Sequence, residues 1–295
     1  MDDAALATQA FESHRSHLRS VAYRMLGSLS EADDAVQEAW LRLARSDTSE
    51  VRNLRGWLTT VIARVCLDML RSRRTRLEEP LDDVHLPDPI VGVIGDGGPE
   101  EQAMLADSVG LALLVVLDTL SPSERLAFVL HDIFGVPFEQ IGTILDRSTD
   151  AAKQLASRAR ARLRGASSPS AVDVRAHKQV VDAFLAASRN GDFEGLLALL
   201  DPDVVLRADA GDGPFGPSRI VRGAEAVVQQ AMLYNSLAKL AQPVLVNGLP
   251  GVIVVRDGKP LSLLSVQVRD GRIVGLDIIA DPDRLQRLGL VNAND

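Results

Sequence analysis

The stretch "PFEQIGTILDRSTDAAKQLASRARARLR" (Pro137–Arg164) decides how the middle of this chain folds. Phe138, Ile141 and Leu145 recur at helical spacing and predict a short helix with one buried face. "DRS" (Asp146–Ser148) is typical of a tight turn. A second helix follows, and it is expected to pack through a narrow face of mostly small residues, Ala152, Ala156, Ala159 and Leu163. The pattern therefore predicts a helix, a short turn and a second helix over about residues 137–164.

The second of these helices is strongly basic. Residues 147–164 carry six basic side chains and one acidic one, in a chain whose formal net charge is -8. Arginine can grip phosphates or pair with guanine edges, and glutamine can pair with adenine. Helix–turn–helix units place their second helix in the DNA major groove. The helix alone also fits an ordinary Ala/Arg-rich surface helix, but the preceding helix and turn favour DNA.

Most of the acidity lies in residues 78–98, "EEPLDDVHLPDPIVGVIGDGG", which hold six acids and no base. The proline and glycine content indicates a linker. Two roles stay open for it. It is either a solvated, flexible tether, or a segment that repels DNA or covers basic surfaces until a partner displaces it.

Length and composition limit the classes of protein to which this chain can belong. At 295 residues the chain suits two or three domains, and 46% of its residues are hydrophobic, so cores can form. The longest strongly apolar run, Leu111–Leu117, is too short to span a bilayer, and no signal segment is evident. The single cysteine, Cys66, excludes an internal disulfide and is expected to be a buried, inert thiol. We expect a cytoplasmic protein that needs no cofactor.

The N-terminal part is predicted to be helical. "SEADDAVQEAWLRLA" (Ser30–Ala44) suggests Ser30 as N-cap with Asp33 at the capping-box position. Its apolar residues form a stripe of helical period that is expected to be buried: Ala32, Ala35, Val36, Ala39, Trp40 and Leu43. Another helix is expected after Asn53. Ser121-Pro122-Ser123-Glu124 predicts a further helix start, and Gly135 is expected to interrupt that helix.

These segments together resemble a group-four sigma factor, the extracytoplasmic-function type of bacterial transcription initiation subunit. "EADDAVQEAWLRL" is similar to the family's polymerase-core-binding helix in region two, and "NLRGWLTTVIARVCLDMLRSRR" to the helix that engages the minus-ten promoter element. The segment Leu120–Arg164 resembles region four, which reads the minus-thirty-five element. The resemblance implies two partners, RNA polymerase core and promoter DNA.

The resemblance also implies roles for individual positions. Core binding is expected from Asp33, Asp34, Gln37 and Glu38. The minus-ten element is expected to meet Asn53, Arg55 and Trp57. The recognition surface is expected to comprise Arg147, Ser148, Lys153, Gln154, Ser157, Arg158 and Arg160. Leu155 stands where many relatives have a basic residue, so one backbone contact is expected to be missing.

The last part changes character after "SSPSA" (residues 167–171). Helical segments are followed by four strand-like runs with glycine-containing turns, and Arg269-Asp270-Gly271-Arg272 predicts a hairpin. This order implies an α+β fold with a curved antiparallel sheet wrapped on helices. The expected organisation is region two at 1–77, an acidic linker at 78–98, region four at 99–166 and the α+β domain at 172–295.

The α+β order resembles the SnoaL-like cone, which a subgroup of these sigma factors carries in place of a separate anti-sigma partner. "HLPDPIV" (His85–Val91) is similar to that subgroup's linker motif. "AGDGPFGPSR" (Ala210–Arg219) is similar to its glycine-rich loop, and "DPDRL" (Asp281–Leu285) to its C-terminal motif. We expect this domain to modulate the sigma activity of the same chain, with a small ligand as a further candidate partner.

An enzyme is the competing hypothesis, as a helix-turn-helix regulator fused to a small-molecule-binding or catalytic SnoaL-like domain. Catalysis in a cone needs an acid or base inside it. Asp209, Asp212 and Asp277 are the candidates for a ligand or docking site, although solvated turn acids are the default near a Gly/Pro loop. No residue is assigned a catalytic role. His14 and His17 share a helical face, but no further metal ligand accompanies them, so no metal site is expected.

Overall fold

The computed structural model describes residues 3–46, 51, 53–76, 84–92, 111–163, 174–211 and 213–288, with the side chains of 3–7 and 74–76 left aside. The chain divides into two compact units. One comprises residues 1–81 and 113–167, and the other comprises residues 82–112 and 168–295. Each unit therefore joins segments that lie far apart in the sequence.

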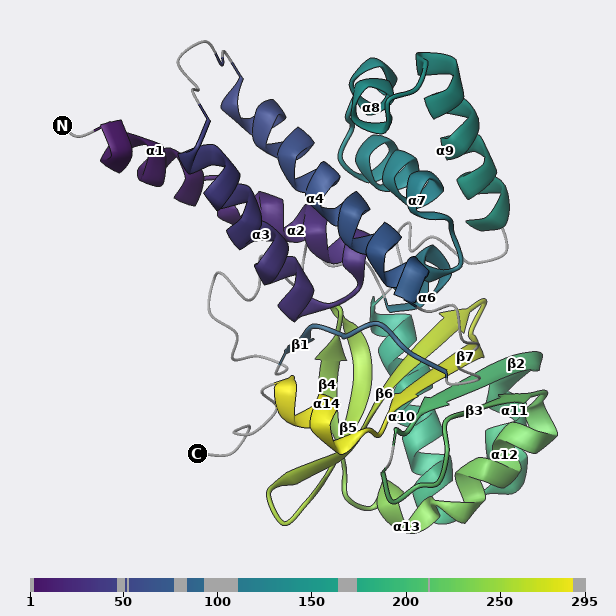
Figure 1. Ribbon diagram of the computed structural model, residues 1–295. Helices are drawn as coiled ribbons and strands as arrows, with labels where there is room; N and C mark the ends of the chain where they lie inside the picture. The colour runs from purple at the N-terminus through teal and green to yellow at the C-terminus, as the bar shows by residue number, and fades with distance from the viewer. Residues whose placement is uncertain are drawn as a thin grey trace. The chain divides into compact units, whose positions relative to one another are not determined.

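The first unit is built from helices (Figure 1). Its region-two part contains α1 (Asp3–Glu12), α2 (Arg15–Leu26), α3 (Leu29–Ala44) and α4 (Leu54–Arg76). Its region-four part contains α6 (Leu111–Asp118), α7 (Pro122–Phe128), the π-helical turn η1 (Val129–Ile133), α8 (Phe138–Leu145) and α9 (Thr149–Leu163). Helix α2 packs on both α3 and α4, and α9 packs on α7 and α8.

The buried stripe on α3 comprises five of the six residues that the helical period predicts, Ala32, Ala35, Val36, Ala39 and Leu43. The sixth, Trp40, is only half-buried. The predicted N-cap is wrong by two residues. Ser28 has an extended backbone and its Oγ accepts from the Glu31 backbone N–H at 3.5 Å, whereas Ser30 lies inside the first turn. Both serines precede acids at suitable spacing, so the sequence alone favoured the wrong one.

The start of α7 is the predicted capping box. Ser121 Oγ accepts from the Glu124 backbone N–H, and the Glu124 carboxylate accepts from the Ser121 backbone N–H at 3.1 Å. Gly135 ends the following turn with φ of +67°, a conformation that glycine adopts without strain. The sequence predicted both features.

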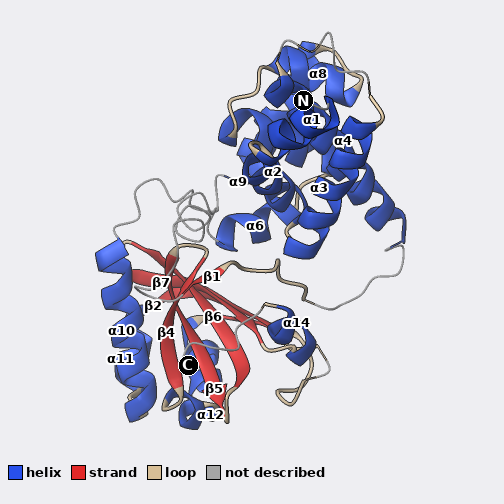
Figure 2. Ribbon diagram, turned by 90° about the vertical axis from the view of Figure 1, so that its left-hand side faces the viewer, coloured by secondary structure: helices blue, strands red, loops and turns tan. Residues whose placement is uncertain are grey.

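The second unit is α+β, as expected (Figure 2). Its helices are α10 (Val174–Asn190), α11 (Phe193–Leu199), α12 (Ala224–Leu233), α13 (Asn235–Ala238) and α14 (Pro282–Arg287). Its strands are β1 (Val91–Gly92), β2 (Leu200–Asp209), β3 (Arg219–Arg222), β4 (Ala241–Val246), β5 (Leu249–Arg256), β6 (Lys259–Arg269) and β7 (Arg272–Ile279). They form one sheet in the order β1-β4-β5-β6-β7-β2-β3.

The sheet is mixed rather than wholly antiparallel, which corrects the sequence prediction. Strands β4 to β7 form the expected meander, and the β6–β7 hairpin turns at Asp270 and Gly271, both with positive φ. The meander delivers β7 beside β2 in the same direction, so this one pair is parallel. Whether β2 and β7 are parallel depends on the order of the strands in the sheet, and the local residue pattern of a strand does not reveal that order.

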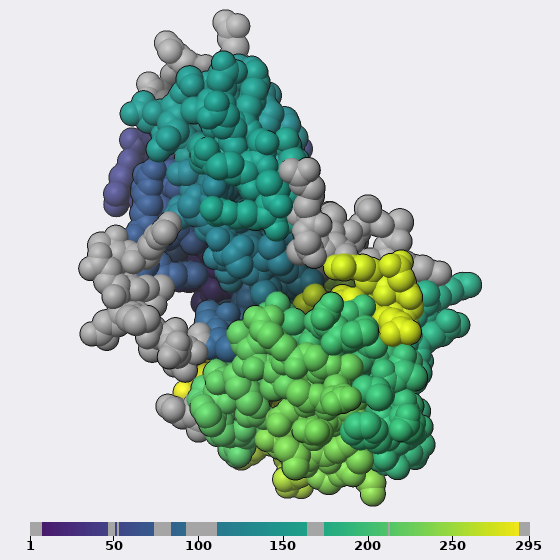
Figure 3. Space-filling model, turned by 90° about the vertical axis from the view of Figure 1, so that its right-hand side faces the viewer, coloured from purple at the N-terminus to yellow at the C-terminus, as the bar shows by residue number. Residues whose placement is uncertain are grey.

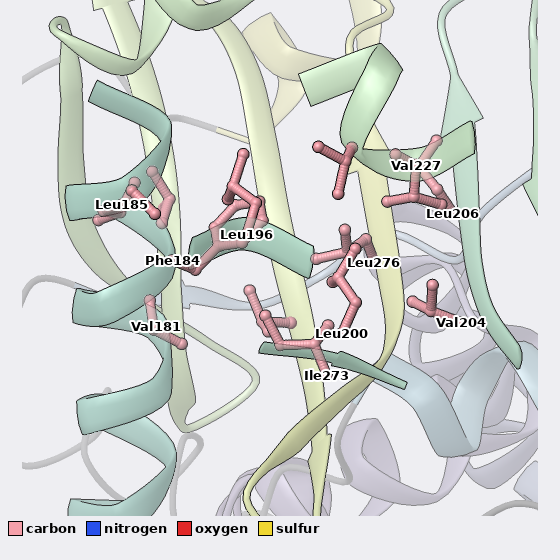
Figure 4. Packing of buried hydrophobic residues seen from close by; sticks show 14 of the residues in the cluster. Val181, Phe184, Leu185, Leu196, Leu200, Val204, Leu206, Val227, Ile273 and Leu276 are labelled. Carbon is pink, nitrogen blue, oxygen red and sulfur yellow. The ribbon is translucent and has the colours of Figure 1, made fainter. Parts of the chain in front are cut away.

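The core of the second unit lies between its helices and the sheet. Figure 4 shows Phe184 and Leu185 of α10, Leu196 of α11, Leu206 of β2 and Leu276 of β7 in this layer. All five are at most 7% exposed. Burial of such side chains contributes about 1.5–3 kcal/mol each, so this layer fixes the positions of the strands.

Candidate polymerase, promoter and linker interfaces

The proposed core-binding side chains lie off the buried stripe of α3: Asp33, Asp34, Gln37 and Glu38. Asp33 accepts hydrogen bonds from Arg19 of α2 at 2.6 and 3.0 Å. Glu38 pairs with Arg42 one turn away at 2.9 Å. Exposed ion pairs of this kind contribute about 0–1 kcal/mol, so a basic partner surface can replace them at little cost.

The proposed minus-ten residues lie at the first turn of α4. The Asn53 side chain acts as the N-cap, because its Oδ1 accepts from the Gly56 backbone N–H at 2.9 Å. Arg55 is exposed and approaches His17 Nδ1 at 3.3 Å, whereas Trp57 is half-buried. Asn53 therefore has a structural role that the sequence argument did not assign to it.

Region four contacts region two next to this turn, within the first unit. Gln140 of α8 donates to Thr60 Oγ1 at 2.9 Å and to the Gly56 carbonyl at 3.2 Å. Arg125 of α7, which is 3% exposed, donates to the Arg24 carbonyl at 3.2 Å. The first helix of the helix-turn-helix thus lies against α4 within one turn of its proposed DNA-reading end.

The helix-turn-helix has the predicted geometry. Asp146 ends α8 in the left-handed conformation, and Ser148 Oγ caps α9 by accepting from the Ala151 backbone N–H at 3.2 Å. A Cβ on Gly142 would lie 2.8 Å from the Arg147 carbonyl oxygen, so the close approach of α8 to the turn before α9 requires glycine. The buried face of α9 comprises Ala152, Leu155, Ala156, Ala159 and Leu163.

Seven proposed recognition residues are exposed: Arg147, Ser148, Lys153, Gln154, Ser157, Arg158 and Arg160. Figure 3 draws the region-four part of the chain in teal. Leu155 is 5% exposed and belongs to the buried face of α9. Its side chain is therefore not placed to contact the phosphate backbone of DNA. The basic face and the packing face are therefore separate sides of one helix.

Three arginines of α9 are held by acids of their own domain. Glu124, whose side chain is 6% exposed, lies 3.3 Å from Arg158 Nε and accepts from Arg162 at 2.8 Å. Arg160 pairs with Asp132 of η1 at 2.7 Å. Burial raises the pKa of Glu124, but hydrogen bonds from Ser121, the charge of Arg162 and a hydrogen bond from Arg158 outweigh it and lower the pKa overall.

The linker segment 84–92 belongs to the second unit. Strand β1 pairs antiparallel with β4, with Val91 opposite Val246. Just before it, the Ile90 N–H donates to Asn247 Oδ1 at 2.6 Å and the Asn247 N–H donates to the Ile90 carbonyl at 2.7 Å. Leu86 is 1% exposed and Ile90 is 9% exposed. This part of the linker is docked on the second unit and ends in an added edge strand, Val91–Gly92, so it is not a solvated tether.

A buried arginine joins the linker to two parts of the α+β unit. Arg284 of α14 pairs with Asp209 at the end of β2, and with Asp88 of the linker at 2.6 Å. It also donates to the Leu86 carbonyl at 2.5 Å, while the Leu86 N–H donates to Asp209 at 2.8 Å. Arg284 is 4% exposed and Asp209 is 5% exposed. Removing one member of such a group leaves a buried charge without its partner.

We call the group formed by Arg284, Asp209, Asp88 and Leu86 the linker network. The three motifs of the SnoaL-like resemblance, His85–Val91, Ala210–Arg219 and Asp281–Leu285, meet at it. Asp281 caps α14 by accepting from the Arg284 N–H at 3.1 Å. A Cβ on Gly211 would lie 2.3 Å from the Asp281 carboxylate, so the glycine-containing loop packs directly on this motif. His85 is largely exposed, with its Nδ1 3.6 Å from Asp209. No local sequence signal predicted that these segments would converge.

The acids proposed for a ligand or docking site have separate positions. Asp209 belongs to the linker network. Asp277 is 1% exposed and binds Arg207 at 3.2 Å and Gln267 at 2.5 Å. Burial raises the pKa of Asp277, and Arg207 and Gln267 oppose that change. Neither acid lines the mostly apolar cavity that α10, α12 and the sheet enclose in this unit. Asp212 lies outside the described residues.

Cys66 and the histidines considered as metal ligands were the remaining candidates for reactive or metal-binding residues. Cys66 is 0% exposed and burial raises the pKa of its thiol, which agrees with the prediction of an inert residue. His17 lies 3.2 Å from Thr59 Oγ1. Within the described ranges, His, Cys, Asp and Glu side chains nowhere gather in threes as a metal site would need. Nor does any described helix combine the length and apolar character needed to cross a bilayer.

The two helical parts of the first unit define a class of protein. Residues 10–76 match the sigma-70 region 2 family, and residues 110–163 match the sigma-70 region 4 family. Sigma factors bind RNA polymerase core and promoter DNA to begin transcription, and they are not enzymes.

Whole-chain relatives narrow the class. The chain is 35% identical to the probable ECF RNA polymerase sigma factor SigI of Mycobacterium tuberculosis, over 95% of this chain and 94% of the relative. It is 39% identical to the ECF sigma factor SigJ of the same organism, over 93% and 91%. The crystal structure of SigJ matches with a TM-score of 0.76 and 36% identity, covering 97% of this chain and 100% of that one. The chain belongs to the extracytoplasmic-function (ECF) family of RNA polymerase sigma factors.

Proposed function

We propose that this sigma factor is regulated by its own C-terminal unit, which holds the linker between regions two and four. The supporting observation is the buried network of Arg284, Asp209, Asp88 and Leu86, together with the β1–β4 pairing. The linker must follow regions two and four when they move to two promoter elements. Docking it on the sheet restricts the arrangements that these regions can adopt.

The residue roles form part of the same proposal. The acidic face of α3 meets a basic surface of polymerase core. The first turn of α4 reads the minus-ten element, and the exposed face of α9 reads the minus-thirty-five element. The protein acts in the cytoplasm, where the polymerase works.

The closed arrangement of regions two and four supports a need for regulation. Gln140 of region four hydrogen bonds to Gly56 and Thr60 of α4, next to Arg55 and Trp57. These contacts must be exchanged when the two regions separate on a promoter. A tethered domain has a high effective concentration, so even a weak contact that holds the linker can set the balance between arrangements.

Polymerase can shift this balance only through different affinities for the docked and released states of the linker. The same condition applies to a small ligand of the C-terminal unit. Such a ligand therefore belongs to the proposal only if its site adjoins the structure that holds the linker.

Run-off transcription with purified polymerase core tests the proposal. The full-length chain is compared with a chain ending at Ala166, over a range of core concentrations. We expect both chains to initiate from the same promoter but with different yields and without any added partner protein. Equal yields at every concentration would leave the C-terminal unit without a regulatory role.

A further inference from the structure

The α+β unit contains a cavity that the linker network does not use. It lies on the helix-covered side of the sheet, between α10, α12, α13 and strands β2, β5, β6 and β7, and its volume is about 150 Å³. Most of its wall is apolar, including Phe184, Leu206, Val252, Leu264, Leu276 and Ile278. Phe184, Leu206 and Leu276 come from three different elements in Figure 4. A cavity of this size and character can hold a single aromatic ring.

One charged side chain lines this mostly apolar cavity. Arg219 of β3 donates to the Phe215 carbonyl at 3.0 Å and to the Tyr234 hydroxyl at 3.2 Å. Its Nε is buried and makes no hydrogen bond to any described residue. The side chain as a whole is half-buried, and no carboxylate in the described part of the chain forms an ion pair with it. A guanidinium with a buried nitrogen usually has such a partner.

Two further groups add polar capacity beside Arg219. The Tyr234 hydroxyl accepts from Arg219 and keeps its own proton to donate. Ser188 Oγ of α10 is buried and has no partner among the described residues. Both residues line the cavity. A buried donor without an acceptor is destabilising, and an anion that accepts from these groups would remove that penalty.

We propose that this cavity binds a small apolar carboxylate of about the size of benzoate. The apolar wall takes the ring, and the carboxylate accepts from Arg219 Nε and the Tyr234 hydroxyl. A planar carboxylate suits the guanidinium better than a neutral group, because charge-assisted hydrogen bonds are about twice as strong as neutral ones. Asp209 and Asp277, which would repel an anion, do not line the cavity.

The cavity also adjoins the linker network, so this inference rests on the proposed function for its regulatory meaning. Leu206, Ala208 and Ala210 line the cavity at alternate positions around β2, while Asp209 between them binds the linker. Alternate residues of a strand face opposite sides of a sheet. A ligand on one side of β2 can therefore change how firmly the linker is held on the other.

Isothermal titration calorimetry on the full-length chain tests the binding site. The probes are benzoate, its neutral analogue benzamide, and acetate, which has the charge without the ring. We expect saturable binding of one benzoate per chain, at least tenfold tighter than either control. Failure of benzoate to bind, or equal affinity for benzamide, would overturn the proposal.

Variants locate the site. Arg219→Gln should weaken benzoate binding at least tenfold and remove the preference over benzamide. Arg222→Gln, an exposed arginine on the same strand, should leave both unchanged. Ala231→Leu, which fills the cavity from α12, should block benzoate while circular dichroism shows an intact fold. Normal benzoate binding by Ala231→Leu would place the site elsewhere and overturn the assignment.

Coupling to the linker is measured separately. Arg284→Ala should change benzoate affinity at least threefold, whereas Arg287→Ala, exposed on the same helix, should not. Equal affinities would overturn the coupling. Transcription by Arg284→Ala without benzoate tests the linker mechanism alone, so failure of the ligand proposal and failure of the proposed function give different results.

Discussion

Basic residues on α9 differ in how firmly their own domain holds them. Arg158 lies against the buried Glu124, whereas the partner of Lys153 among the described residues is Asp150, whose side chain is 85% exposed. The Asp150 pair is therefore easily exchanged for a DNA phosphate. Lys153 is the clearer test of a backbone contact, because its replacement disturbs no buried group.

Lys153→Ala should weaken promoter binding about evenly across sequences and flatten the salt dependence by about one unit of slope, as loss of one phosphate contact does. The measurement is a gel-shift titration of holoenzyme at several salt concentrations. Lys178→Ala, an exposed lysine of α10, is the matched control. An unaltered slope for Lys153→Ala would remove this residue from the DNA interface.

Cys66 should resist modification in the folded protein. It is 0% exposed, and burial raises the pKa of its thiol, so little reactive thiolate exists at pH 8. We expect iodoacetamide to label one thiol per chain in strong denaturant and almost none without it, as counted by mass spectrometry. Rapid labelling of the native chain would show that α4 does not pack as described.

The acidic face of α3 provides a test at the scale of an element. Asp34→Arg together with Glu38→Arg should abolish association with polymerase core without unfolding the chain, because both residues lie off the buried stripe. A pull-down with core polymerase measures the loss, and thermal unfolding checks the fold. Asp182→Arg with Glu194→Arg, at outer positions of α10 and α11, is the matched charge change. Unchanged pull-down by the α3 variant would assign core binding to another face.

The turn between α8 and α9 provides a second test at the scale of an element. Gly142→Ala should destabilise the first unit by about 1–3 kcal/mol, because its Cβ would lie 2.8 Å from the Arg147 carbonyl. Thr143→Ala, the exposed neighbour, should cost much less. Urea unfolding followed by the fluorescence of Trp40 and Trp57 reports on this unit. Equal stability of the two variants would contradict the close approach of α8 to the turn before α9.

The elements were predictable where local chemistry decides them. The capping box at Ser121 and Glu124 and the hairpin at Asp270 and Gly271 depend on neighbouring residues, and both were predicted. The choice of Ser28 over Ser30 as N-cap was not, because both fit the same local rule. The parallel β2–β7 pair depends on strand order, so periodicity could not indicate it.

In the candidate site too, only the features set by neighbouring residues could be predicted from the sequence. The exposed basic face of α9 follows from residue spacing. The Glu124–Arg158 pair joins residues 34 apart, and the bond from Leu86 to Asp209 joins residues 123 apart. Such contacts depend on tertiary packing. The sequence therefore left a solvated tether and a covering segment both open for the linker, whereas in the structure residues 84–90 dock on the second unit and Val91–Gly92 join its sheet.

At the scale of the whole molecule, one chain contains both the initiation apparatus and the unit that holds its linker. The Arg284 network is the point where this connection can be broken with least change elsewhere. Loss of one partner from a buried, hydrogen-bonded charge pair costs about 3–5 kcal/mol. Arg284→Ala should therefore release most of the linker while leaving regions two and four intact.

Run-off transcription by the full-length Arg284→Ala chain with polymerase core tests this central claim most directly. We predict that its yield departs from that of the unaltered chain in the same direction as the yield of the chain ending at Ala166, while Arg287→Ala matches the unaltered chain. Equal yields from Arg284→Ala, Arg287→Ala and the unaltered chain, at every core concentration, would contradict the account.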